Sequence, residues 1–325
     1  MKSILLAPIA FIYQIINYFW DLYWRHKKPV KLTAKVISVG NITIGGSGKT
    51  SIAGFIAENR LHRGFKTALV ARGYKRPNNK PVIISGDCPF SWEDCGDEPA
   101  ALAKSIPGLS IYVDSNKTRA AKQASNDGFE FIIIDDGFQH RDLFRDLDIV
   151  CLNASNPYGN RLLLPAGILR EPKNALTRGD AIIIIYESGE SDKAQWGLPG
   201  NIPIFRAMKI MAGIKSLGGK SVEIRGKRVV GFCGLGNPES FYNSLNDIGC
   251  EIREFMKFRD HHIYKLSDIN KIIRVCKNEN CHAAVTTLKD AVKLEQIWTA
   301  EIPLYYLEIT IKFEKEAEFF KLLDI

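Results

Sequence analysis

The sequence lacks the patterns that mark several large classes of protein. Its seven cysteines are odd in number and contain no C-x-x-C pair, which argues against a disulfide framework and a zinc site. It carries no helix-turn-helix, zinc-finger or aromatic-basic RNA motif, so we predict no nucleic-acid partner. No internal repeat or low-complexity segment is evident. These absences favour a globular protein with reduced thiols.

What is present suits a large folded core. The chain has 325 residues, of which 46% are hydrophobic and 25% charged, the balance of a soluble globular protein long enough for two domains. Its formal net charge of +8 indicates an anionic partner, such as a nucleotide, a phosphorylated substrate or an anionic lipid surface. Charge alone does not choose among these partners.

The N-terminal segment is apolar and then basic. Residues 4–20 are rich in Ile, Phe, Tyr and Trp, but Pro8, Gln14 and Asn17 interrupt them, and a membrane span needs about 20 apolar residues. Aromatic residues that favour a membrane interface and a basic flank follow: Trp20, Tyr23, Trp24, Arg25, Lys27, Lys28, Lys31 and Lys35. We predict a membrane-associated helix within residues 1–30 that lies in or partly enters the cytoplasmic leaflet. A helix packed on the protein's own core and a full transmembrane span remain as alternatives.

The stretch KVISVGNITIGGSGKT, residues 35–50, is the strongest motif. It has the order of strand, glycine-rich turn and helix start that a phosphate-binding loop requires. In such a loop the backbone N–H groups and the helix N-terminus face phosphate oxygens, the lysine reaches the outer phosphates and the hydroxyl binds Mg²⁺. The strict pattern has glycine where Thr43 stands, so the match is to the GKT end. The predicted ATP-binding residues are Gly45, Gly46, Ser47, Gly48, Lys49 and Thr50.

A second signal is the run FIIIDDGFQH, residues 131–140. Four apolar residues that end in aspartate predict a buried parallel strand, which brings a carboxylate to the phosphate loop. Asp135 or Asp136 can hold Mg²⁺ there, directly or through water. Because successive side chains point to opposite faces of an extended strand, the second carboxylate serves the substrate side or caps the turn.

Strands and helices alternate along the chain, which predicts a doubly wound, mostly parallel α/β sheet. Four glycines indicate a domain joint: Gly213, Gly218, Gly219 and Gly226. We therefore predict the N-terminal helix in residues 1–30, an ATP-binding P-loop domain in residues 31–212 and a smaller α/β domain in residues 213–325.

Residue type alone does not decide the roles of three polar residues. Asp97, in CGDEP, is placed to cap the helix that follows it. His261, in RDHHIY, lies between a strand and a helix, where adjacent histidines are more often surface residues than ligands. Arg72, in a basic turn after a strand, either meets phosphate or is a solvated loop residue.

Taken together and in this order, the blocks GNITIGGSGKT, RGY, GDEP, IIIDDGFQH, LLPAGILREP, FCGLGNPESF, RDHHIY and TTLKDAVKL resemble the tetraacyldisaccharide 4′-kinase family of lipid A biosynthesis. The resemblance implies a P-loop kinase-like fold with a second α/β domain. It implies transfer of the γ-phosphate of ATP, with Mg²⁺, to the 4′-hydroxyl of a tetraacylated glucosamine disaccharide 1-phosphate, which gives lipid IVA. It also implies an anionic membrane surface as partner and a place at the cytoplasmic face of the bacterial inner membrane. It indicates no obligate protein partner.

The same resemblance assigns residues. Asp97 and His261 match the pair credited with activating the sugar hydroxyl. Asp135 or Asp136, with Glu171, are similar to the family's metal-site carboxylates, next to Thr50. Six further positions match substrate-side residues without individual roles: Arg72, Tyr74, Arg119, Gln139, His140 and Arg170. The chain departs from the family pattern at Ser51, where proline is usual, and at Leu288, where glutamate is usual, in a motif to which we assign no role.

A protein of another class remains as the alternative. Membrane-associated switch ATPases of the partitioning type also carry GGxGKT, and they hydrolyse ATP without a sugar-lipid acceptor. They place a signature lysine where this chain has Ile44, which argues against that interpretation.

Overall fold

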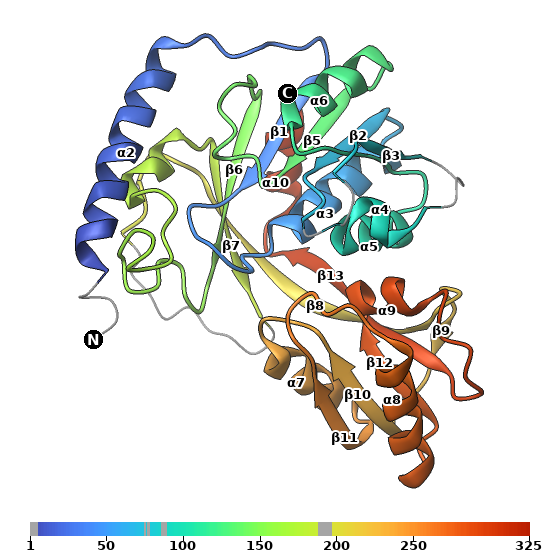
Figure 1. Ribbon diagram of the computed structural model, residues 1–325. Coiled ribbons are helices and arrows are strands. Elements are labelled where there is room, and N and C mark those ends of the chain that lie inside the picture. The colour runs from blue at the N-terminus through green and yellow to red at the C-terminus, as the bar shows by residue number, and fades with distance from the viewer. Residues whose placement is uncertain (1–5, 75, 77–78, 86–89, 188–196) are drawn as a thin grey trace.

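The computed structural model describes residues 6–74, 76, 79–85, 90–187 and 197–325. Two α/β units lie one beside the other, and two long strands, β8 (Ile204–Ser216) and β13 (Leu304–Phe313), run between them (Figure 1). The N-terminal helix α2 (Ala7–His26) lies along the outer side of the first unit.

The first unit is built on parallel strands that are buried at nearly every position. In their spatial order these strands are β7 (Ala181–Tyr186), β6 (Leu147–Asn153), β1 (Lys35–Gly40), β5 (Phe131–Asp135), β2 (Thr67–Ala71) and β4 (Ser110–Val113), with β3 (Val82–Ile84) antiparallel at the edge. Burial on both faces explains why these strands read as unbroken apolar runs. The helical segments are α3 (Lys49–His62), α4 (Trp92–Cys95), α5 (Asp97–Ser105), α6 (Lys117–Asn126) and the 3₁₀ turn η1 (Lys173–Arg178).

The second unit is smaller and also parallel. Its strands are β11 (Glu251–Lys257), β10 (Arg228–Cys233) and β12 (Ala283–Thr287), and its helices are α7 (Pro238–Ile248), α8 (Leu266–Asn278) and α9 (Leu288–Leu294). Strand β12 pairs with β13, β13 pairs antiparallel with β8, and β8 pairs with β7. A single 13-stranded sheet therefore continues through both units, and the predicted mostly parallel α/β class is confirmed.

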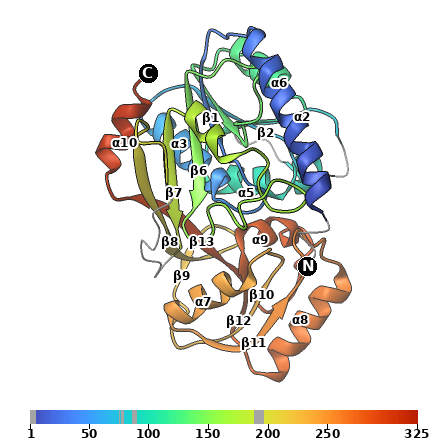
Figure 2. The same ribbon diagram turned by 90° about the vertical axis from the view of Figure 1, so that its left-hand side faces the viewer.

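The predicted joint at Gly213 lies inside a continuous strand. Gly213 has a φ of +138°, and the register between β8 and β13 shifts there, so the glycine accommodates a β-bulge and the strand does not end. The C-terminal helix α10 (Glu316–Leu323) returns to the first unit (Figure 2). There the Phe319 ring lies 5.3 Å from the ring of Phe205 on β8. The division at 212/213 stays a prediction, and the chain crosses between the units at both β8 and β13.

Helix α2 contacts the first unit through polar residues spaced four apart. Tyr13 Oη and Asn17 Nδ2 donate to the carbonyl oxygen of Arg170, at 3.0 and 3.3 Å, and Asp21 pairs with Arg141 at 2.6 Å. Most of its large apolar side chains are exposed: Ile9, Phe11, Ile12, Ile15, Ile16, Tyr18, Phe19, Trp20, Leu22 and Tyr23. The alternative of a helix packed on the protein's own core is therefore wrong. Among the described residues no helix combines the length and the apolarity needed to cross a membrane.

Candidate active site

The phosphate loop connects β1 to α3, as predicted. Gly48 precedes α3 with a φ of +77°, a left-handed backbone that favours glycine, and a Cβ at this position would lie 2.7 Å from Ile185 Cδ1. Asn41 Nδ2 donates to the hydroxyl oxygens of Thr43 (3.1 Å) and Ser47 (2.9 Å). Thr43, which departs from the strict pattern, therefore helps Asn41 to brace the loop.

Both aspartates that follow the central strand lie against the start of α3. Thr50 Oγ1 donates to Asp135 Oδ2 at 3.0 Å, and Lys49 Nζ lies 3.5 Å from Asp136 Oδ1. The expectation that the two carboxylates face opposite sides of a strand is wrong. Strand β5 ends at Asp135, and Asp136 adopts a left-handed backbone with a φ of +53°, which turns its side chain to the same site.

The two carboxyl groups differ in charge state. Burial, together with the charge of Glu98, raises the pKa of Asp135 to about 6. Burial would also raise the pKa of Asp136, but Lys49, Lys117 and Arg170 outweigh it and lower that pKa to about 2. Asp136 is therefore ionised across the physiological pH range, whereas Asp135 takes up a proton as the pH falls towards 6.

The surroundings of Asp135 fit Mg²⁺. Its Oδ1 is buried and has no hydrogen-bond partner among the residues that the structure describes, and its Oδ2 lies beside the Thr50 hydroxyl. No group of three or more His, Cys, Asp or Glu side chains in the described ranges could hold a metal unaided. Mg²⁺ at phosphate sites takes one or two protein ligands and completes its shell with phosphate and water oxygens.

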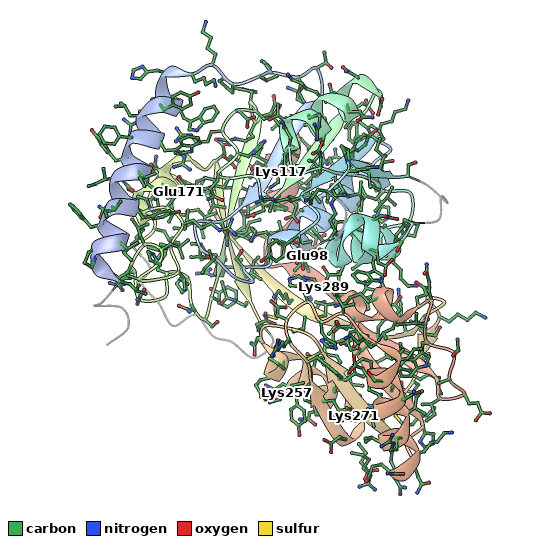
Figure 3. The ribbon with its side chains drawn as sticks, in the orientation of Figure 1. Glu98, Lys117, Glu171, Lys257, Lys271 and Lys289 are labelled. Carbon is green, nitrogen blue, oxygen red and sulfur yellow. The ribbon has the colours of Figure 1, made fainter. Side chains whose placement is uncertain are left out.

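Lys117, at the start of α6, is a site residue that the sequence analysis missed. Its buried ammonium donates to the carbonyl oxygens of Asp135 (2.7 Å) and Asp136 (2.6 Å), and so holds the turn after β5. Figure 3 shows Lys117 inside the first unit. Burial lowers its pKa, although the two aspartates oppose this. Its position opening a helix at the carboxyl edge of a parallel sheet was the available signal.

Three residues of the predicted metal and substrate sets form one network with the phosphate loop. Arg170 Nη1 donates to both carboxylate oxygens of Asp136, each at 3.0 Å. Gln139 Nε2 donates to Glu171 Oε1 at 2.9 Å, and Arg178 pairs with Glu171 Oε2 at 2.6 Å. Because protein donors engage both oxygens of Glu171, its predicted metal role would require one of these contacts to open.

Two further predicted residues lie around α6. Arg119 donates through Nε and Nη2 to the two oxygens of Asp114, at 2.7 and 2.8 Å, and its side chain remains 58% exposed. His140 Nε2 lies 3.1 Å from Thr118 Oγ1 and 3.1 Å from Asp142 Oδ1. Both are held by neighbouring polar groups and have no contact with Asp97 or His261 among those described.

The second part of the site joins the two units. Asp97 opens α5, His261 precedes α8, and Asp97 Oδ2 lies 2.8 Å from His261 Nδ1. Their side chains are only 8% and 16% exposed. The prediction that Asp97 caps α5 is wrong, because Gly96 holds that position and the Asp97 carboxylate binds His261. The exposed Tyr74, two residues after the exposed Arg72, places its ring 5.5 Å from that of His261.

Charge is matched across this junction. Burial would raise the pKa of Asp97, but the hydrogen bond and charge of His261, with the charge of Lys293, lower it. The hydrogen bond to Asp97 raises the pKa of His261. Each member of the pair therefore favours the charged form of the other.

Helix α9 meets α5 through ion pairs that the sequence analysis also missed. Lys293 Nζ lies 3.5 Å from Asp97 Oδ2, and Lys289 pairs with Glu98. Figure 3 shows Glu98 and Lys289 close together where the two units meet. Both lysines belong to TTLKDAVKL, the motif that had no assigned role.

Comparison with known proteins supports one assignment. A family model described as tetraacyldisaccharide-1-P 4′-kinase matches residues 2–325. The chain belongs to this family. The tetraacyldisaccharide 4′-kinase of Syntrophus aciditrophicus is 35% identical, over 96% of this chain and 92% of the relative. The enzyme of Aquifex aeolicus is 34% identical, over 98% and 97% of the two chains.

A solved structure from the family agrees with the fold. The crystal structure of LpxK from Aquifex aeolicus in complex with ATP aligns with a TM-score of 0.83 at 30% identity, over 99% of this chain and 98% of that one. As a member of this family, the protein is an ATP-dependent kinase that uses ATP with Mg²⁺. The family match favours the kinase over the switch ATPase.

Proposed function

We propose that the protein transfers the γ-phosphate of ATP to the 4′-hydroxyl of tetraacyldisaccharide 1-phosphate, giving lipid IVA, and that Asp97 activates the hydroxyl. The observation that carries this proposal is the 2.8 Å contact between Asp97 and His261, made between the two units. Glu98, the residue after Asp97, is close enough to Asp135 for its charge to raise the pKa of that carboxyl group. The Asp97–His261 pair therefore lies near the phosphate site.

The chemistry needs a proton acceptor close to the sugar. The 4′-oxygen attacks the γ-phosphorus, a new P–O bond forms, and the bond from that phosphorus to the β,γ-bridging oxygen breaks to release ADP. The hydroxyl proton passes to the Asp97 carboxylate, since a positioned base speeds such a step by about 10²–10⁴-fold. His261, as a cation, orients the carboxylate and balances its charge.

At the phosphate end, Lys49 would bind the outer phosphates, while Thr50 and Asp135 would hold Mg²⁺. We assign the direct metal contact to Asp135, because Lys49 and Arg170 already engage Asp136. When bound, Mg²⁺ neutralises charge on the β- and γ-phosphate oxygens. The remaining candidates supply cations and hydrogen-bond donors for the phosphorylated sugar: Arg72, Tyr74, Arg119, Gln139, His140 and Arg170.

We also propose that the protein works at the cytoplasmic face of the bacterial inner membrane, as a peripheral or monotopic protein. An acylated substrate resides in a bilayer, and helix α2 exposes a band of aromatic and aliphatic side chains that suits the interface. The net charge of +8 favours anionic headgroups.

The test is transfer of labelled γ-phosphate to tetraacyldisaccharide 1-phosphate in detergent. Asp97→Ala should lower transfer about 1000-fold and His261→Ala about 100-fold, with ATP affinity retained. Asp94→Ala and His282→Ala, which change exposed residues nearby in sequence, are matched controls that should stay active. If ATP hydrolysis does not depend on the lipid and is unchanged in Asp97→Ala and His261→Ala, the protein is a switch ATPase and the proposal is wrong.

A further inference from the structure

We infer that Lys293 is a positioning residue for Asp97, and that Asp290 holds it in place from within the second unit. This inference rests on the proposed role of Asp97. It gives a function to TTLKDAVKL, whose residues fold far along the chain from CGDEP and meet it only across the junction of the two units.

The ammonium of Lys293 is surrounded by oxygen atoms. Its Nζ lies 2.9 Å from Asp290 Oδ1, 3.0 Å from the carbonyl oxygen of His262 and 3.5 Å from Asp97 Oδ2. The side chains of Lys293 and Asp290 are only 2% and 0% exposed. The hydrogen bond to the carbonyl oxygen of His262 and the ion pair with Asp290 fix the position of the ammonium. Because an ammonium has three N–H donors, a donor remains available to Asp97.

Asp290 is fixed in turn, by the frame that also holds His261. Asp290 Oδ2 accepts from the backbone N–H of Gly234 at 2.8 Å and from Thr287 Oγ1 at 2.9 Å. The carbonyl oxygen of Gly234 accepts from the backbone N–H of His261 at 3.2 Å. The backbone of one residue, Gly234, therefore helps to position both side chains that approach Asp97.

Both cations approach the same oxygen of the carboxylate. His261 Nδ1 and Lys293 Nζ contact Asp97 Oδ2, so we assign Oδ1 to the hydroxyl proton. A buried carboxylate is costly unless positive groups surround it. The other titratable neighbours are Lys289 on α9, Cys95 just before α5, and Asp290 behind Lys293. Loss of Lys293 should therefore raise the pKa of Asp97 and loosen its orientation.

The same two helices offer a matched control. Lys104 on α5 pairs with Glu295 at the end of α9, and Glu295 is 45% exposed. Lys104→Met breaks one ion pair between α5 and α9 and leaves the surroundings of Asp97 intact. An equal loss of transfer in Lys104→Met and Lys293→Met would mean that both lysines act only by holding α5 against α9.

The experiment measures transfer with the full-length protein as a function of pH. Lys293→Met should lower kcat about 100-fold, as expected when a reacting group is displaced by about 1 Å. It should move the acid limb of kcat/KM upward by about one pH unit, since a neighbouring cation lowers a carboxyl pKa by about 1–3 units. The KM for ATP should change less than about twofold. Lys293→Arg keeps the charge, so the acid limb of its kcat/KM profile should lie close to that of the unmodified protein. Lys104→Met should leave the acid limb unmoved.

Two further variants keep the test decisive. Lys293→Met leaves the buried charge of Asp290 unpaired, which lowers thermal stability. The double variant Asp290→Asn/Lys293→Met should recover thermal stability but keep the shifted acid limb of kcat/KM. In an Asp97→Asn background, Lys293→Met should have less than about a twofold effect, because its target is gone. An unmoved acid limb, or a full additional loss in that background, overturns the inference. Full transfer by Asp97→Asn alone would overturn the proposed function instead.

Discussion

The two halves of the site are built in different ways. The phosphate half comes from elements of one unit, where Gly48, Lys117 and the turn at Asp136 fix the backbone. The junction half comes from α5, the loop before α8 and α9, and ion pairs between the units hold Asp97 and His261 together. The phosphate half is therefore complete without the second unit, whereas the junction half depends on how the units are placed.

Because the two halves differ in this way, changes in the phosphate half should weaken both ATP binding and phosphate transfer. The largest effect is expected for Lys49→Met. Loss of this ammonium, 3.5 Å from Asp136, removes the cation that would meet the outer phosphates. Transfer should fall about 1000-fold, the scale of losing a preorganised charge partner, and ATP affinity should fall with it. Phosphate transfer and equilibrium nucleotide binding are the two measurements.

The control for this change lies at the start of the strand that leads into the phosphate loop. Lys35 begins β1, pairs with Asp146 at 3.6 Å, and is 48% exposed. Lys35→Met should leave both quantities within about twofold of the unmodified protein. A Lys49→Met protein that keeps its ATP affinity would erase the distinction between the two halves.

The next effect is expected at Lys117, which has no predicted contact with substrate. Lys117→Met leaves the carbonyl oxygens of Asp135 and Asp136 without their shared donor and releases the left-handed turn. Transfer should fall about 10- to 100-fold, and the free energy of unfolding should fall by about 1–3 kcal/mol.

Lys122→Met on the same helix, at an exposed position, controls for the loss of a lysine from α6. Activity assays and urea unfolding give both readouts. Equal behaviour of the two variants would mean that Lys117 does not hold the turn.

The sequence predicts the phosphate half better than the junction half because the phosphate half is local. Lys49, Thr50 and the strand that ends at Asp135 follow from contiguous patterns, whereas Asp97 and His261 were assigned by family resemblance. Lys293 was missed because a lysine in an apolar helix carries no mark of a partner about 200 residues away, and only the packing of α9 on α5 supplies it. The turn at Asp136 was misjudged because a left-handed residue is not visible in a strand pattern.

The core strands were predicted well, since strands buried on both faces leave apolar runs with polar ends. The glycine at position 213 misled for a physical reason: it was interpreted as a joint, but it makes a bulge within β8. Helix α2 reverses the usual pattern, because its polar stripe faces the protein and its apolar residues face outward. Hydrophobicity alone does not reveal which face contacts the protein.

A smaller effect is expected where α2 contacts the phosphate half. Tyr13→Phe removes the hydroxyl that donates to the carbonyl oxygen of Arg170, whose guanidinium binds Asp136. One neutral hydrogen bond contributes about 0.5–1.5 kcal/mol, so kcat/KM with micellar substrate should fall about two- to tenfold. Tyr18→Phe makes the same change on an exposed face of α2 and should have no effect. A matching loss in Tyr18→Phe would point to the exposed side of α2 and away from the Arg170 contact.

The smallest expected effect concerns one histidine in each half of the site, His261 in the junction half and His140 in the phosphate half. The contact with Asp97 raises the pKa of His261 above 6.5, so its stabilising contribution is complete below pH 6.5 and is lost as the pH rises through the raised pKa. Burial, with Lys117 and Arg145, lowers the pKa of His140, so its contribution is present above pH 6.5 and is lost as the pH falls. Relative to the unmodified protein, His261→Gln should lose about 1 kcal/mol of unfolding free energy at pH 6 and less at pH 9, while His140→Gln should show the reverse order. Urea unfolding at the two pH values measures both, and parallel behaviour of the variants would show that the two halves do not differ in their electrostatics.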